Sequence, residues 1–125
     1  MEGDVSFDLP PGHPDEGQEI AAYYLWLFPN MMFNFYPWGL SVNVVMPVSH
    51  KRCRILYRGY VKDAELAGQG AGSVLDTVEN QDQWVIEEVQ KGMASRAYDR
   101  GRYSPTREQG VHHFHRMLSQ FNQAS

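Results

Sequence analysis

The sequence has little cysteine, no long apolar run and no concentration of positive charge. Cys53 is the single cysteine among 125 residues, so the chain offers no second thiol for an internal disulfide and no cysteine cluster for zinc or an iron-sulfur centre. No apolar run approaches the roughly 18 residues that span a bilayer, and the first residues are acidic, unlike a basic leader. These absences predict a cytoplasmic protein without a membrane partner, in which Cys53 is a small strand residue.

The overall charge also excludes a class of partner. The formal net charge is -4 and the basic residues are scattered, whereas nucleic-acid binding relies on clustered Lys and Arg that neutralise phosphates. With 42% hydrophobic and 21% charged residues in 125 positions, the composition is that of one globular domain. We therefore expect a single core and no nucleic-acid partner.

Aromatic residues, in contrast, are concentrated in one short segment. Dense aromatic side chains in strands usually form a core, and the same surface can line a pocket for a flat apolar ligand. The segment contains Tyr23, Tyr24, Trp26, Phe28, Phe33, Phe35, Tyr36 and Trp38.

The order of patterns along the chain predicts strands first and helices afterwards. Residues 1–19 are rich in proline and glycine, which disfavour regular structure and indicate an irregular arm. Apolar runs and alternating patterns then predict four strands, and their short connections favour an antiparallel meander. The expected strands are residues 22–28, 31–36, 40–46 and 53–61.

Two helices are predicted after a Gly- and Ala-rich connector at 63–73. Ser73, with Asp76 three residues on, resembles a capping box, so a long helix is expected from there to Tyr98. Ser104-Pro105 provides an N-cap and a first-turn proline for a last helix that reaches about Asn122. The predicted fold class is α+β, with helices on one face of an antiparallel sheet. Such a sheet has two open edges and more apolar surface than two helices cover.

One charged residue breaks the pattern of the long helix. At about 100° per residue, Asp82 lies near the centre of an arc of apolar side chains. A carboxylate in an apolar interior must be protonated, paired with a cation or bound to a metal. The helical pattern alone leaves open an ion pair with Arg54 or Arg58 and ligation of a metal. The apolar arc consists of Leu75, Val78, Val85, Ile86, Val89 and Met93.

The histidines are not predicted to form a metal site. His112, His113 and His115 spread over about 160° around the last helix, too far apart to converge on one ion. We interpret them as residues beside a buried stripe of Val111, Phe114, Leu118 and Phe121. His13, in a Pro-Gly segment, is interpreted as a surface residue.

Two motifs in a fixed order resemble those of a known family. Residues 28–37 read FPNMMFNFYP, and residues 82–95 read DQWVIEEVQKGMAS. They resemble the "FPN...N.YP" segment and the "D....E.VQ.G..S" helix of the alpha subunits of Rieske-type ring-hydroxylating oxygenases. The match continues through residues 101–104 and 108–114, so it covers about residues 18–122. The resemblance implies that residues 20–125 are the C-terminal portion of that family's catalytic domain, with 1–19 as the arm.

The resemblance also implies a fold and an iron site. The family's catalytic domain has a helix-grip (START-like) fold, of which this chain would hold a part. A mononuclear Fe(II) is bound there by two histidines and one aspartate, a facial triad with open positions. The family's aspartate precedes the VQ glutamine by eight residues; this glutamine is Gln90, so the implied ligand is Asp82. The two histidines and the 2Fe-2S Rieske domain lie upstream in the family, and no corresponding region occurs in this chain.

The implied activity belongs to a complete enzyme, a mono- or dioxygenase that hydroxylates aromatic or similarly apolar small molecules with oxygen. The chain alone is expected to be inactive, with no catalytic residue apart from the metal ligand. Its expected partners are an upstream catalytic half or a second copy bound through open sheet edges, and a reductase or ferredoxin in the complete system. The pocket residues inferred from the aromatic segment are Trp26, Phe28, Phe33 and Phe35. Two alternatives are a non-catalytic helix-grip module that binds apolar ligands and a half-domain that serves only assembly.

Overall fold

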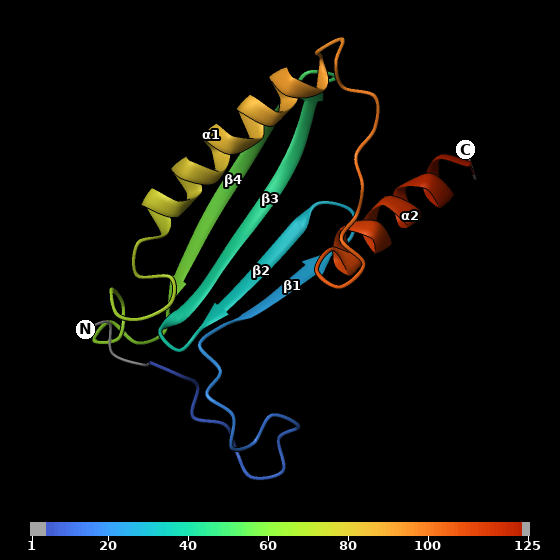
Figure 1. Ribbon diagram of the computed structural model, residues 1–125. Helices are drawn as coiled ribbons and strands as arrows, with labels where there is room; N and C mark the ends of the chain where they lie inside the picture. The colour runs from blue at the N-terminus through green and yellow to red at the C-terminus, as the bar shows by residue number, and fades with distance from the viewer. Residues whose placement is uncertain (1–4, 124–125) are drawn as a thin grey trace. The chain divides into compact units, whose positions relative to one another are not determined.

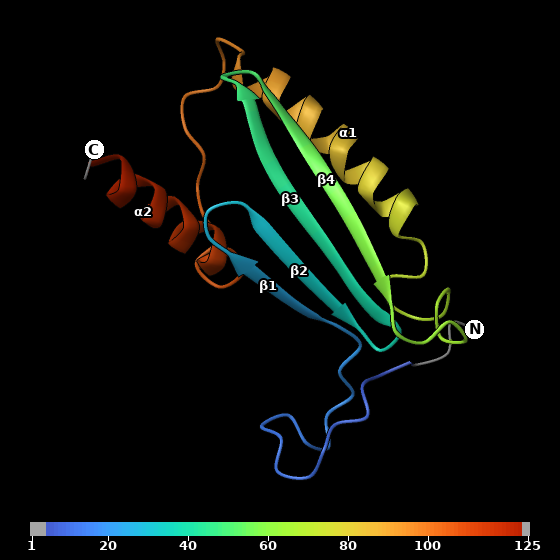
Figure 2. The same ribbon diagram turned by 180° about the vertical axis from the view of Figure 1, so that it is seen from behind.

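Four strands form a single antiparallel sheet in the computed structural model, which describes residues 5–123. The strands are β1 (Tyr23–Leu27), β2 (Met31–Tyr36), β3 (Gly39–Ser49) and β4 (Arg52–Val61). They pair in sequence order, so the predicted meander is confirmed. Seen from either side, β1 and β4 form the two edges of the sheet (Figures 1 and 2).

The register of the strands sorts their side chains between two faces. Leu25 lies opposite Phe33, and Phe33 lies opposite Val42. Directly paired residues share a face, and neighbours along a strand alternate between faces. One face therefore carries Tyr23, Leu25, Leu27, Met31, Phe33, Phe35, Leu40, Val42, Val44, Leu56 and Tyr60. The other carries Tyr24, Trp26, Met32, Asn34, Tyr36, Ser41, Asn43, Ile55 and Tyr57.

The third strand is longer than the sequence pattern predicts. The expected end at Pro47 is wrong, because β3 continues to Ser49. Pro47 still lies opposite Cys53, and the register shifts between Pro47 and Ser49. Proline has no N–H for the ladder and is tolerated at such irregularities, so it disturbs this strand without ending it.

The best-buried part of the sheet lies where β2 turns into β3. Tyr36 and Trp38 are only 5% and 6% exposed, and Ser41 and Val42, near the start of β3, are buried as well, one on each face of the sheet. The rings of Tyr36 and Trp38 stack with centroids 5.1 Å apart and planes 7° from parallel. The Trp38 indole Nε1–H donates to the carbonyl oxygen of Ala71 at 3.0 Å, which ties the 63–74 connector to the sheet. The predicted aromatic core is confirmed for these two rings.

The first helix, α1 (Leu75–Met93), is shorter than expected at both ends. It begins two residues after Ser73, with Asp76 in the first turn, where negative charge is favourable. Its predicted continuation to Tyr98 is wrong. The Ala94 and Ser95 amides donate to Lys91 and Gly92 as tighter turns, and the Ser95 hydroxyl accepts the Ala97 N–H. A serine that bonds its own backbone competes with helical bonds, which accounts for the early end.

The second helix, α2 (Gln109–Gln123), begins later than its sequence signal suggests. Residues 105–107 form a separate turn. The Ser104 N–H donates to the Glu108 carboxylate, and the Glu108 N–H donates to the Ser104 carbonyl. The Glu108 carbonyl accepts the His112 N–H, as the N-cap residue of a helix does. Glu108, rather than Ser104, therefore caps α2.

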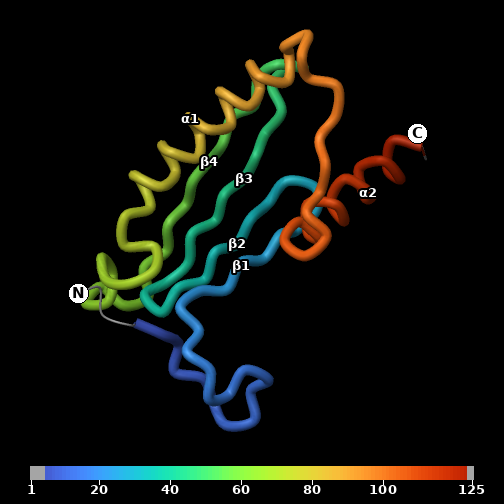
Figure 3. The backbone as a smooth tube through the Cα atoms, in the orientation of Figure 1, coloured from blue at the N-terminus to red at the C-terminus, as the bar shows by residue number. Residues whose placement is uncertain are grey.

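The segment before β1 has no helix or strand from residue 5 to residue 22, as Figure 3 traces. The arm predicted at 1–19 stays a prediction as a division of the chain; residues 5–19 contain no helix or strand, and residues 1–4 lie outside the described part. The Phe7 N–H donates to the Ile20 carbonyl at 2.9 Å, so the arm folds back on itself before β1.

The sheet and two helices confirm the α+β class. The chain divides into two compact units, with the boundary between Thr77 and Val78. The predicted helix-grip arrangement, which concerns how the long helix sits against the sheet, stays a prediction. No helix in the described range is both long and apolar enough to cross a membrane.

Gly72 offers a test of the buried aromatic pair. It has a φ of +80°, and a Cβ placed on it would lie 2.9 Å from Tyr36 Cζ and 3.1 Å from Trp38 Cζ2. Gly72→Ala should lower the free energy of unfolding by roughly 2–5 kcal/mol, because left-handed strain and overpacking add. Gly68→Ala is the control, since Gly68 has a φ of +93° and no atom within 4 Å of its Cβ position. Gly68→Ala should lower the free energy of unfolding by only about 1–2 kcal/mol. Equal losses in urea unfolding would contradict the close packing of Gly72 on the rings.

Candidate metal centre

Asp82 lies in the first half of α1, among apolar side chains of the same helix. Val78 and Ile86 are four residues away on either side, and Val85 is three residues away, so all three neighbour Asp82 on the helix surface. The helix thus places one carboxylate within an apolar arc, as the pattern predicts.

The structure corrects the expectation that this arc is buried. Within the described part of the chain no residue of α1 is buried, and Ile86 is 59% exposed. Trp84, on the opposite side of the helix, is exposed as well. Exposed aliphatic side chains arranged along one helix face usually mark a surface that another element covers. The sequence pattern identifies the arc correctly, but it does not say which chain supplies the cover.

The described residues do not form a complete metal site. Among residues 5–123, no group of three His, Cys, Asp or Glu side chains is arranged to hold an ion. A facial triad for ferrous iron needs two imidazoles and one carboxylate. Asp82 fits the carboxylate position by its chemistry, and both nitrogen ligands would have to come from elsewhere.

The alternative partners of Asp82 lie on the last strand. Arg54 and Arg58 project from the same face of β4, opposite Met46 and Val42 respectively, and both are exposed. An ion pair with Asp82 would join the two compact units, and it stays a prediction.

Two of the three helical histidines meet at a residue that the sequence analysis did not single out. The Tyr103 hydroxyl and His115 Nδ1 share a hydrogen bond, and the Tyr103 ring contacts His112 edge-on with centroids 5.1 Å apart. His113 is exposed. The i, i+3 spacing of His112 and His115 could have indicated a shared face, but the contact depends on the turn that returns Tyr103 to α2.

The apolar stripe predicted on the last helix is not buried. Phe114 and Leu118 are half-buried, Val111 and Phe121 are exposed, and none of the described residues of α2 is buried. As for α1, the periodicity identifies one apolar face of the helix, and its residues are not buried.

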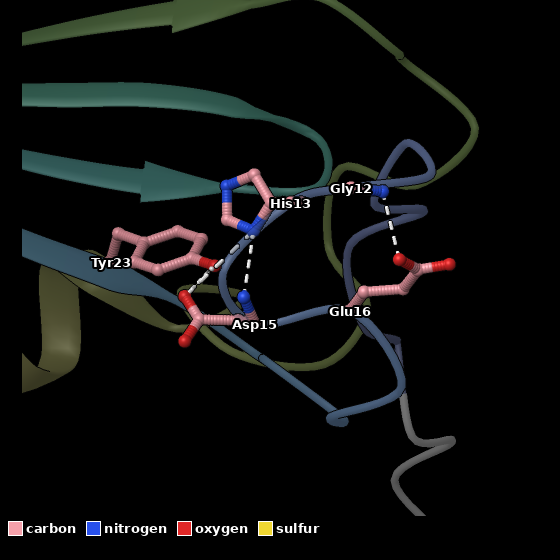
Figure 4. A network of polar contacts seen from close by, with 5 residues as sticks. All are labelled: Gly12, His13, Asp15, Glu16 and Tyr23. Atoms are coloured by element: carbon pink, nitrogen blue, oxygen red, sulfur yellow. Dashed lines mark hydrogen bonds and ion pairs between the residues drawn. The ribbon is translucent and has the colours of Figure 1, made fainter.

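His13 belongs to a small polar network in the arm (Figure 4). It is half-buried, and its Nδ1 accepts the Asp15 N–H at 3.1 Å. The Tyr23 hydroxyl donates to Asp15 Oδ2 at 2.8 Å, and the Tyr23 ring packs against Phe7 with centroids 5.3 Å apart. The interpretation of His13 as a surface residue is therefore only partly right: its ring takes part in fastening the arm to the first residue of β1.

This network raises the pKa of the Tyr23 hydroxyl above its ordinary value. The main cause is partial burial, which disfavours the phenolate, and the hydrogen bond to Asp15 and the negative charge of Asp15 act in the same direction. The protonated phenol is thus the form that the folded arm favours.

The four predicted pocket residues do not share one face of the sheet. Phe33 and Phe35 lie on the same face, with ring centroids 6.4 Å apart and nearly parallel planes. Trp26 pairs with Met32 and lies on the other face, and Phe28 stands in the turn after β1. The register thus divides the set, and which of its members line a pocket stays a prediction.

The comparison with known proteins identifies the family of the chain. The family model described as "Ring hydroxylating alpha subunit (catalytic domain)" matches residues 2–124. The chain belongs to this family. Its curated relatives include Rieske-type monooxygenases, so the predicted membership in the ring-hydroxylating oxygenases is confirmed.

Three relatives show how much of such an oxygenase the chain represents. It is 35% identical to choline monooxygenase, chloroplastic, of Arabidopsis thaliana over 78% of this chain and 24% of that protein. It is 30% identical to choline monooxygenase, chloroplastic, of Atriplex hortensis over 96% of this chain and 29% of that protein. It is also 30% identical to the carnitine monooxygenase oxygenase subunit of Escherichia coli K12, over 85% of this chain and 32% of that protein.

The chain thus spans about a quarter to a third of the length of these relatives. No solved structure matches it significantly.

The arm network predicts a dependence on one hydroxyl group. Tyr23→Phe removes the donor to Asp15 and keeps the ring that contacts Phe7 and His13, so limited proteolysis should cut the arm several-fold faster. Tyr60→Phe, at an exposed position on β4, should leave the rate of cleavage unchanged.

The pH dependence has a definite sign. Because the folded pKa of Tyr23 is raised, its contribution to arm stability is complete below the unfolded pKa of about 10 and is lost as pH rises through the folded pKa. Arm cleavage in the parent protein should therefore accelerate above about pH 10, and Tyr23→Phe should remove this alkaline step. An alkaline step that persists in Tyr23→Phe would show that another group controls the arm.

Proposed function

We propose that this chain supplies the carboxylate iron ligand, Asp82, and part of the substrate pocket of a Rieske non-haem iron oxygenase. Residues 20–125 would form the C-terminal portion of the catalytic domain, and the chain would be inactive alone. The observation that carries this proposal is the position of Asp82: a single carboxylate at the centre of an apolar helix face, in a chain that matches the family's catalytic domain.

The exposed arc of α1 supports the need for a complement. Val78, Val85 and Ile86 surround Asp82 and are all exposed. A polypeptide that covers this arc would also bring its own side chains close to the carboxylate. The two histidine ligands would come from that polypeptide, the upstream catalytic half, which completes a facial triad.

The chain's own residues have limited and separate tasks in this proposal. Asp82 contributes negative charge and one oxygen ligand, and Val78 and Ile86 keep water away from it once the arc is covered. Phe33 and Phe35 provide a flat apolar surface for part of a substrate. A bound ferrous ion would supply the activation of oxygen, and a 2Fe-2S cluster in the missing part, fed by a reductase or ferredoxin, would supply electrons.

The substrate class has two candidates. The aromatic side chains of the sheet favour an aromatic or similarly apolar small molecule. The names of the relatives favour a second class, because choline and carnitine both carry a trimethylammonium group. Aromatic faces attract such cations, and Tyr24 and Trp26 are exposed on one side of β1. Hydroxylation next to a quaternary nitrogen is therefore the alternative reaction of the complete enzyme.

A non-catalytic module that binds apolar ligands, or a half-domain that serves assembly, is the rival function. It would use the same sheet without iron. Ligand binding that does not change when a ferrous salt is added would favour this rival. The location in the cytoplasm also stays a proposal, and the plant relatives named above are chloroplastic.

The decisive test compares iron content in two variants. The chain is coexpressed with an upstream catalytic half bearing the two histidines, and iron in the purified complex is measured by mass spectrometry. We expect about one iron per complex in the parent and nearly none in Asp82→Asn, because a triad that loses its carboxylate holds ferrous iron weakly. Asp76→Asn is the matched control. Asp76 is also an exposed carboxylate of α1, but it lies outside the apolar arc, so its variant should keep the iron.

The other outcomes are equally clear. Iron that is retained in Asp82→Asn would refute the role of Asp82 as a ligand. Two halves that associate without binding iron in any variant would refute the oxygenase proposal and leave the binding or assembly module.

A further inference from the structure

One face of the sheet carries a group of polar side chains on its two central strands. Asn34 of β2 lies directly opposite Ser41 of β3, and Asn43 follows on the same side of β3. Diagonal neighbours across an antiparallel pair, as Asn34 and Asn43 are, have Cα atoms about 7–8 Å apart. These three residues, the amide patch, therefore form one compact group in the middle of the sheet.

The opposite face of the same two strands is apolar at every corresponding position. Asparagine is uncommon inside strands, where packing favours β-branched and aromatic residues. Two asparagines on one face of central strands therefore need a reason other than packing. The apolar positions of the opposite face are Met31, Phe33, Phe35, Leu40, Val42, Val44 and Met46.

Aromatic residues flank the amide patch on both sides. Tyr24 of β1 lies opposite Asn34, and Tyr57 of β4 lies opposite Asn43. The Tyr24 ring also contacts Tyr36 edge-on, with centroids 6.2 Å apart. A few convergent polar groups within an aromatic surface are the usual composition of a small-molecule site.

The hydrogen bonds of the amide patch leave donors without protein partners. The Ser41 hydroxyl, only 3% exposed, donates to Asn43 Oδ1 at 3.1 Å, so the Asn43 side chain is held by its oxygen. Within residues 5–123, neither Asn43 Nδ2 nor the Asn34 amide has a hydrogen-bond partner. Amides that become covered without partners are costly, whereas an oxygen atom of a ligand would satisfy them.

The connector lies over one end of this same face. Tyr36, two residues after Asn34, shares its face of β2, and a Cβ placed on Gly72 would lie 2.9 Å from the Tyr36 ring. The chain thus begins to cover the face that carries the amide patch. A ligand bound there would lie beside the connector rather than on an open surface.

We propose that Asn34 and Asn43 orient the substrate by donating hydrogen bonds to an oxygen acceptor on it, either a hydroxyl or a carboxylate. The inference rests on the proposed oxygenase function and assigns its specificity to the amide patch. Asn43 has a defined donor direction, because Ser41 occupies its oxygen.

The rest of the face selects between the two substrate classes. Tyr24 and Trp26 lie on the same face as the amide patch, whereas Phe33 and Phe35 lie on the other. Aromatic faces attract quaternary ammonium groups. The patch therefore favours a small molecule that combines such a cation with an oxygen acceptor.

Asn43→Asp tests the donor alone. Aspartate keeps an oxygen that accepts from Ser41 but replaces the outward N–H donor by a charged acceptor. The probes are carnitine, which has a carboxylate, and tetramethylammonium, which has no oxygen. Calorimetric titration of the complex with the upstream half should show carnitine affinity falling roughly tenfold to hundredfold in the variant, with no loss for tetramethylammonium. Unchanged carnitine affinity would overturn the proposal.

Asn122→Asp is the matched control, since it makes the same charge change at an exposed position of α2. It should leave both affinities unchanged, and an equal loss of carnitine affinity there would show that net charge, not the amide patch, controls binding. Asn34→Asp should weaken carnitine binding as Asn43→Asp does. Circular dichroism confirms that each variant is folded.

Iron content, measured in parallel, separates this proposal from the proposed function. The titration reports ligand binding whether or not iron is present. A complex without iron whose carnitine affinity still depends on Asn43 would refute the iron site and keep the amide patch. A complex that holds iron and binds carnitine equally well in Asn43→Asp would refute the amide patch alone. A parent complex that does not bind carnitine would overturn the inferred ligand class.

Discussion

The stacked rings of Tyr36 and Trp38 are the contact on which the packing of the connector against the sheet depends. They lie at the turn between β2 and β3, where the few buried residues of the described chain gather. The Trp38 indole holds the connector through Ala71, and Gly72 lets the backbone approach the rings closely. The connector leads directly into α1 (Leu75–Met93). Elsewhere the sheet is held by its backbone ladder more than by a thick core.

Patterns that depend on neighbours in sequence were readable from the sequence. Alternation and short turns located all four strands to within a few residues, and helical periodicity found both helices and the arc around Asp82. The errors lie where a single side chain competes with the backbone. The Ser95 hydroxyl ends α1 early, Glu108 rather than Ser104 caps α2, and Pro47 is accommodated within β3. Such choices depend on local hydrogen bonds that residue preferences do not encode.

The candidate site was predictable only in part, for a different reason. Asp82 could be identified because a charge in an apolar arc is conspicuous in any helical projection. Hydrophobic periodicity shows which face of a helix is apolar, but it does not show which element packs against that face. Trp26 lies on the opposite face of the sheet from Phe33 and Phe35. This could be known only from the strand register, which composition does not provide. The contact of Tyr103 with two histidines required the returning turn before α2.

The carboxylate of Asp82 has a second consequence while its helix is uncovered. Without this charge, α1 would carry an uninterrupted strip of exposed apolar side chains, formed by Val78, Val85, Ile86 and Val89. A charge in the middle of such a strip acts as a gatekeeper, because any indiscriminate apolar contact would have to strip its hydration shell. Only a surface that offers a cation or other compensating groups at that point can close over the strip favourably. Asp82, which would bind the metal in the assembled protein, would thus also disfavour nonspecific apolar association before assembly.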